Sequence, residues 1–154
     1  MFMRAEVVFV VAPLLLLLLG VSAYEIRTGL IKDVVTLPGL LYMLVVRALI
    51  GPDAWFKYLL AALLLVVGFV LLSSVPRLFG RDDDWIGFGA VKLLGVVGAA
   101  VGLSGALWVA LGFIAGVAVA MLVTRAVGLD FVPSSPIIGL VVVALLLLRV
   151  ILTV

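Results

Sequence analysis

The stretch Ile86–Leu94, which reads IGFGAVKLL, joins a strongly charged segment to a long apolar one. Its two glycines, Gly87 and Gly89, stand two residues apart, and glycines let a backbone bend or approach another segment without Cβ clashes. Lys92 follows near the start of the apolar run. An ammonium group is unusual in a membrane helix, and its presence there points to a functional role. We therefore interpret this stretch as the entry of a functional polar loop into a helix.

The composition of the whole chain indicates a membrane protein. Of the 154 residues, 68% are hydrophobic and 12% are charged, and the mean hydropathy is +1.55, far outside the range of soluble globular domains. Because a membrane span needs roughly 20 apolar residues, the chain has room for about six short transmembrane helices. The predicted fold is an all-α, polytopic membrane protein whose single transmembrane domain covers residues 1–154.

The residue types that are absent from the sequence limit the catalytic mechanisms that this chain could use. The sequence contains no cysteine and no histidine, which excludes disulfides, thiolate chemistry and the histidine-dependent routes to hydrolysis. Any acid or base must then be a carboxylate, a lysine or a tyrosine. The few scattered charges, with a net charge of +2, suit a lipid bilayer rather than nucleic acid.

Polar loops and turns that contain glycine or proline divide the apolar residues into six predicted spans. They cover about 7–23, 37–50, 55–75, 89–103, 106–124 and 137 to the end, and Ser104-Gly105 supplies a minimal turn between the fourth and fifth. The fourth span is rich in glycine and alanine, including the Gly98-x-x-x-Gly102 spacing that lets helices approach closely. This span is expected to be central rather than exposed to lipid.

Three polar loops, at Tyr24–Thr36, Arg77–Gly87 and Arg125–Ser135, fall on one side of the membrane if there are six spans. With their flanks they hold six cationic residues, against four on the other side, which assigns the loops to the cytoplasm. The second loop contains three successive aspartates, Asp82–Asp84. Such a run can bind a divalent cation, but it lacks the spaced ligands of a calcium loop, and a solvated acidic turn is the favoured interpretation.

Two stretches resemble the signature regions of the type IV prepilin peptidases, which are six-helix membrane aspartyl proteases of the GxGD class. The first pattern is an aspartate, seven residues, an asparagine or aspartate and a Thr-Leu-Pro-like helix start; in this chain Glu25, Asp33 and Thr36–Pro38 occupy those places. The second is Gly-x-Gly-Asp-x-Lys-Leu, and Gly87–Leu93 matches it except that Ala90 stands where the aspartate belongs. The entry into the last helix at Pro133–Pro136 also resembles the family.

The resemblance implies a cell-membrane aspartic endopeptidase that removes the leader of prepilin-like proteins, such as the subunits of a type IV pilus, on the cytoplasmic side without a metal or an organic cofactor. Positions 25 and 90 would form the catalytic dyad, since two neighbouring carboxyls can supply one ionised base and one protonated acid. Gly87 and Gly89 would shape the loop that presents position 90. The absence of cysteine fits the short, peptidase-only form.

Two further polar residues, Asp33 and Lys92, belong to the expected site. Asp33 is expected either to orient the first loop and contact a basic leader or to cap the second helix. Lys92 lies two residues from position 90 and so does not share its helical face. It is expected to pair with a loop carboxylate or an interfacial phosphate rather than with the dyad.

The chain departs from the pattern at both dyad positions. Glu25 adds a methylene, which displaces the carboxylate by roughly an ångström and can cost about a hundredfold in rate, and Ala90 has no carboxyl. We therefore predict little or no proteolysis. Ala90 is explained either by a peptidase disabled by substitution or by a naturally inactive homologue that binds prepilin-like helices. A small channel or carrier is a third alternative, although a transport path would need polar residues along the membrane-spanning segments.

Overall fold

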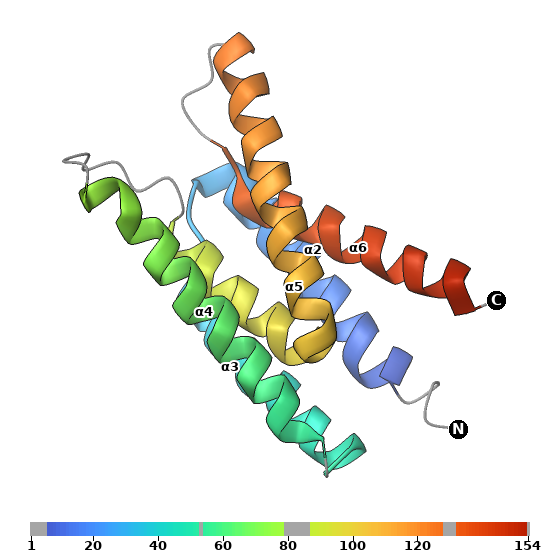
Figure 1. Cartoon of the computed structure of the whole chain (residues 1–154). Helices are drawn as coiled ribbons and strands as arrows, with labels where there is room; N and C mark the ends of the chain where they lie inside the picture. Colours follow the sequence, from blue (N-terminus) through green and yellow to red (C-terminus); the bar gives the residue numbers. More distant parts are fainter. Residues whose placement is uncertain (1–5, 53, 79–86, 128–131, 154) are drawn as a thin grey trace.

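The computed structural model describes residues 6–52, 54–78, 87–127 and 132–153, and these are almost entirely helical (Figure 1). The elements in chain order are the short η1 (Val7–Val11), α2 (Ala12–Thr28), α3 (Asp33–Ile50), α4 (Trp55–Leu78), α5 (Phe88–Val127) and α6 (Ser134–Thr153). No strand occurs within those ranges, so the all-α class is confirmed.

The lengths and apolar composition of the helices confirm a membrane protein. Four helical stretches are long and apolar enough to cross a bilayer, and a fifth apolar helix, Ser134–Leu148, is shorter; the four are Val7–Thr28, Asp33–Ile50, Trp55–Ser74 and Phe88–Thr124. The count of six spans is not confirmed. The regions predicted as the fourth and fifth spans lie in one element, α5, and a break in its helical backbone divides it into two parts.

The predicted turn at Ser104-Gly105 is wrong, because both residues are helical and the break in α5 lies at Gly102. The backbone of Gly102 has φ 74° and ψ −177°, a conformation that is essentially restricted to glycine. A Cβ there would also lie 2.8 Å from the Tyr58 ring. The first part of α5 runs beside α4, and the second part turns away from it (Figure 1, yellow and orange).

Small residues on α5 permit close packing with two different helices. In the first part, a Cβ on Gly98 would lie 2.9 Å from the Ala61 carbonyl oxygen of α4. In the second part, a Cβ on Gly116 would lie 2.5 Å from the Ile137 side chain of α6. Every residue from Ala90 to Ala100 except Lys92 is buried, which confirms that the first part of α5 is central.

The first polar loop is much shorter than the predicted Tyr24–Thr36. Helix α2 continues to Thr28 and ends at Gly29, whose left-handed backbone donates its N–H to the Glu25 carbonyl at 2.7 Å, a common way to end a helix. Helix α3 begins at Asp33, so that Pro38 lies inside it instead of opening it. The short turn makes α2 and α3 antiparallel neighbours, and it places Glu25 and Asp33 at the same end of the protein.

Candidate active site

Glu25 is a buried carboxylate that is bound by the start of another helix. It lies near the end of α2 and is 4% exposed. One carboxylate oxygen accepts hydrogen bonds from the backbone N–H of Ser134 at 3.1 Å and from its hydroxyl at 2.9 Å. The other accepts the backbone N–H of Ser135 at 2.7 Å and the Ser135 hydroxyl. Both oxygens of Glu25 therefore serve as a cap for α6.

The local sequence of α6 explains why it takes a cap from α2. The first N–H groups of a helix have no partner within the helix, and Pro136, the third residue of α6, has no N–H. Glu25 binds the N–H groups of the two residues before it, and an anion at a helix N-terminus is further favoured by the helix dipole. Sequence reasoning missed Ser134 and Ser135, although two serines between Pro133 and Pro136 are typical helix-start residues.

Position 90 lies in the first turn of α5 and carries no polar group. The Ala90 side chain is buried, at 1% exposure, and its backbone N–H donates to the Gly87 carbonyl at 2.9 Å. Within the described residues, the side-chain hydrogen bonds of Glu25 all go to α6. The pairing of positions 25 and 90 stays a prediction.

The two glycines before Ala90 have different environments. A Cβ on Gly89 would lie 2.6 Å from Ile31 Cβ and 3.3 Å from the Ile31 carbonyl oxygen, whereas a Cβ on Gly87 would meet nothing within 4 Å. Gly89 is therefore the point where the turn between α2 and α3 contacts the start of α5. The close approach expected of this glycine pair occurs at Gly89 alone.

Lys92 and Asp33 form an ion pair that joins the start of α5 to the start of α3. The Lys92 Nζ lies 2.6 Å from Asp33 Oδ1 and 5.2 Å from the centre of the Phe88 ring. The predicted pairing of Lys92 with a loop carboxylate is thus confirmed. Asp33 lies in the first turn of α3, but the N-cap position is Lys32 and no side chain caps the helix there, so Asp33 connects the loop to α5 instead of acting as the cap.

One buried hydroxyl at this end has no hydrogen-bond partner among the described residues. Thr36, in the first turns of α3, is 1% exposed, and its Oγ1 is unpaired there. Buried polar groups are nearly always paired. Thr36 therefore marks a buried position where an additional polar group would be stabilised.

The predicted acidic turn Asp82–Asp84 lies outside the described residues. Within the described ranges, no group of three or more aspartate or glutamate side chains lies close enough together to hold a metal ion.

The Gly89 contact predicts a selective loss of stability. We expect Gly89→Ala to lower the free energy of unfolding by about 1–3 kcal/mol, the usual cost of overpacking, because the new methyl group meets the Cβ and the carbonyl oxygen of Ile31. Reversible unfolding in mixed micelles measures this. Gly87→Ala, where the methyl meets open space, is the matched control and should cost less than about 1 kcal/mol. Equal losses in the two variants would contradict the assigned contact.

Comparisons with known proteins place the chain in a family. The model of the type IV leader peptidase family matches residues 11–147, a range that includes Glu25, the Gly87–Lys92 stretch and the serines at the start of α6. Comparisons with curated proteins and with solved structures give no match. Since the family match covers most of the sequence, the chain belongs to the type IV leader peptidase family.

Proposed function

We propose that this chain binds prepilin-like proteins in the manner of a leader peptidase but does not cleave them. The observation that carries the proposal is the engagement of Glu25, whose two oxygens accept four hydrogen bonds from Ser134 and Ser135. A general base must be within hydrogen-bond reach of the water proton that it removes. A carboxylate that is occupied as a helix cap is poorly placed for that task.

The second requirement of the reaction is an acid that polarises the scissile carbonyl. Two carboxyls near each other supply acid and base together, and the buried methyl of Ala90 supplies neither. Loss of the acid and engagement of the base together account for the proposed inactivity.

The fit between Glu25 and the two serines also bears on the origin of the departures. The glutamate side chain is long enough for both of its oxygens to accept hydrogen bonds from the hydroxyls and N–H groups of Ser134 and Ser135 on α6. This supports a naturally inactive homologue at position 25 over a peptidase altered there. For Ala90, disabling by substitution and natural loss remain the two explanations.

Substrate binding at this end would use exposed acidic groups and the bilayer. The Asp33 side chain is 56% exposed, and Asp82–Asp84 add negative charge in the sequence. These carboxylates would attract a basic leader electrostatically while the substrate's apolar helix remains in the membrane. The excess of cationic residues around the polar loops supports a cytoplasmic location for this end.

A channel or carrier is less well supported by the buried charges. Among the described residues, Glu25 and Arg47 are the buried charged side chains. Both are held in hydrogen bonds, and they lie at opposite ends of the α2–α3 hairpin, since the 14 residues from Asp33 to Arg47 span roughly 20 Å of helix. Among the described residues, this arrangement does not provide the continuous line of polar side chains that a transport path would need.

The proposal is tested by restoring the dyad. The unmodified protein is expected to bind a prepilin-like peptide in lipid vesicles, measured by cross-linking, without releasing its leader. Ala90→Asp is expected to give weak cleavage, and the double variant with Glu25→Asp should cleave about a hundredfold faster, since a misplacement of roughly an ångström can cost that factor.

The control for the restored site is the double variant Glu25→Asn with Ala90→Asn, which has nearly the same shape but no acid and should be inactive. Cleavage by the unmodified protein would refute the proposed inactivity. If the double variant Glu25→Asp with Ala90→Asp folds and binds the peptide but cleaves none of a panel of such peptides, the assignment of these positions as a dyad is refuted.

A further inference from the structure

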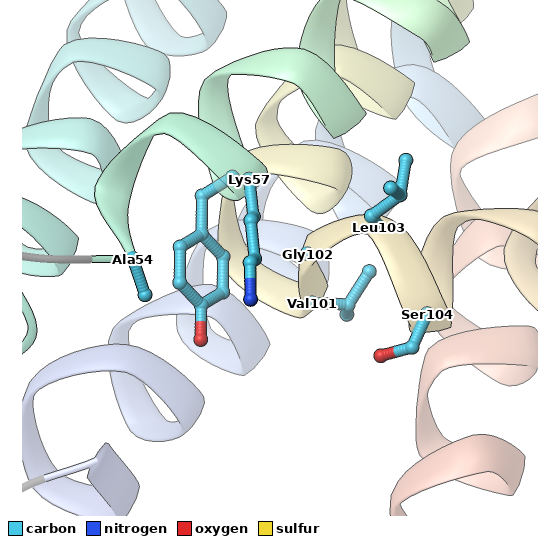
Figure 2. Close-up of a pocket in the computed structure, with 7 residues that line it drawn as sticks. Ala54, Lys57, Val101, Gly102, Leu103 and Ser104 are labelled. Atoms are coloured by element: carbon cyan, nitrogen blue, oxygen red, sulfur yellow. The ribbon is translucent and has the colours of Figure 1, made fainter.

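Two adjoining cavities lie at the end of the protein away from Glu25. The first has a volume of about 530 Å³ and is bounded by the start of α4 and the break in α5 (Figure 2). The second, of about 480 Å³, lies among α2, α5 and α6. Tyr58, Val101 and Ser104 line both cavities, so the two share a wall and together form one composite site.

The two cavities differ in chemistry. In the first, the Lys57 ammonium and the Ser104 hydroxyl reach toward the same open space on either side of Gly102 (Figure 2). The walls of the second are mostly aliphatic, with Val10 and Leu14 from the N-terminal helices and Leu145 from α6 among them. The composite site thus has a cationic, hydrogen-bonding part and an apolar part.

The second cavity also contains charged side chains, but these neutralise each other. Arg47 Nη1 lies 2.7 Å from Glu6 Oε1, and the Nε of Arg47 donates to the Ala100 carbonyl at 3.1 Å. Among the described residues that line the two cavities, Lys57 is therefore the charged residue that takes no part in this ion pair. The composite site favours a ligand with one anionic group and a hydrocarbon chain.

We propose that the composite site binds an anionic phospholipid. The phosphate would lie between Lys57 and Ser104, and one acyl chain would occupy the aliphatic cavity. Helices long and apolar enough to cross a membrane border the site, so a cavity open between them meets lipid. Basic pockets between transmembrane helices bind phosphate headgroups, and the volumes are within the range of about 300–1,000 Å³ that is usual for ligand sites.

The position of the site along the membrane normal agrees with a headgroup. The exposed ring of Trp55 lies in the first turn of α4, two residues before Lys57, and tryptophan rings are enriched at the level of the headgroups. A phosphate at Lys57 would therefore be at its normal depth, and the acyl chain would extend toward the bilayer centre. This lipid site is independent of the proposed function at the other end.

The test measures thermal unfolding of the full chain in a neutral detergent. Phosphatidylglycerol should raise the unfolding midpoint more than phosphatidylcholine does, and sn-glycerol 1-phosphate, which lacks the chains, should have no effect. Lys57→Gln should weaken the apparent affinity for phosphatidylglycerol roughly fivefold, the factor that one basic residue contributes near an anionic lipid. Lys32→Gln, at the opposite end, is the matched control and should leave the affinity unchanged.

A second variant tests the chain-binding part. Leu145→Trp, which places a large ring in the aliphatic cavity, should abolish the difference between phosphatidylglycerol and phosphatidylcholine even if the variant is somewhat less stable. Equal stabilisation by the two lipids in the unmodified protein would overturn the proposal. So would an unchanged affinity in Lys57→Gln, or stabilisation by sn-glycerol 1-phosphate as large as that by the lipid.

Discussion

Replacing Arg47 with alanine is expected to lower the free energy of unfolding by about 3–5 kcal/mol, because a buried carbonyl loses its hydrogen-bond donors and the deleted side chain leaves a cavity. The side chain is 7% exposed and connects three elements. Its guanidinium donates from Nε and Nη2 to the Ala100 carbonyl of α5, pairs with Glu6, and lies 4.2 Å from the centre of the Tyr58 ring.

The break in α5 explains why this position needs a guanidinium. Ala100 lies two residues before Gly102, where the helical backbone is interrupted, and carbonyl groups at such a C-terminal end lack their usual partners. A cation there also interacts favourably with the negative end of the helix dipole. Without Arg47, the buried Ala100 carbonyl would have no donor, at a cost of about 1–3 kcal/mol, and a cavity would add to the loss.

Matched variants separate these contributions. Arg47→Met keeps most of the volume and should cost about 1–3 kcal/mol, because it removes the hydrogen bonds but not the packing. The Glu6 side chain, which is 31% exposed, can be solvated and adds little. Arg27→Met, on an exposed part of α2, is the control and should cost less than about 1 kcal/mol. Reversible unfolding in mixed micelles gives the three values, and a loss below about 1 kcal/mol for Arg47→Ala would contradict the capping role.

The sequence predicts those features that depend on composition and local pattern. The apolar content identifies a helical membrane protein, and the glycines and alanines of residues 89–103 identify a central helix. The sequence also predicts an anionic partner for Lys92, either a loop carboxylate or an interfacial phosphate, because a cation at a membrane entry needs a nearby anion. These inferences need no knowledge of which distant segments meet.

The features that the sequence does not reveal depend on contacts between distant segments. Arg47 bonds a carbonyl 53 residues away, and from sequence it is simply a cation on the far side of the membrane. The bonds from Ser135 to Glu25 span 110 residues. The break in α5 lies at Gly102 instead of Ser104-Gly105, at a point where the Tyr58 ring of α4 leaves no room for a Cβ. In each case the feature involves a partner that is distant in the sequence, and the local pattern does not identify that partner.

The second large effect is expected at Glu25. Replacing it with alanine should lower the free energy of unfolding by about 3 kcal/mol or more, because two backbone N–H groups and two hydroxyls at the start of α6 lose an ionised acceptor, and hydrogen bonds to charged groups contribute about 1.5–3 kcal/mol each. Glu25→Gln should cost less, about 1–3 kcal/mol, since one amide oxygen still accepts while the NH₂ group faces donors. Unfolding in mixed micelles and amide hydrogen exchange at α6 are the measurements.

The control for Glu25 is Asp33→Asn, which removes a carboxylate from the same end of the protein. Its ion pair with Lys92 is exposed, so its loss should cost no more than about 1 kcal/mol. A double-mutant cycle of Glu25→Gln with Ser135→Ala should give a coupling of about 1–3 kcal/mol, as expected for residues in one hydrogen-bond network. Additive losses would show that Glu25 does not cap α6. The carboxylate would then be free for catalysis, and the proposed inactivity would rest on Ala90 alone.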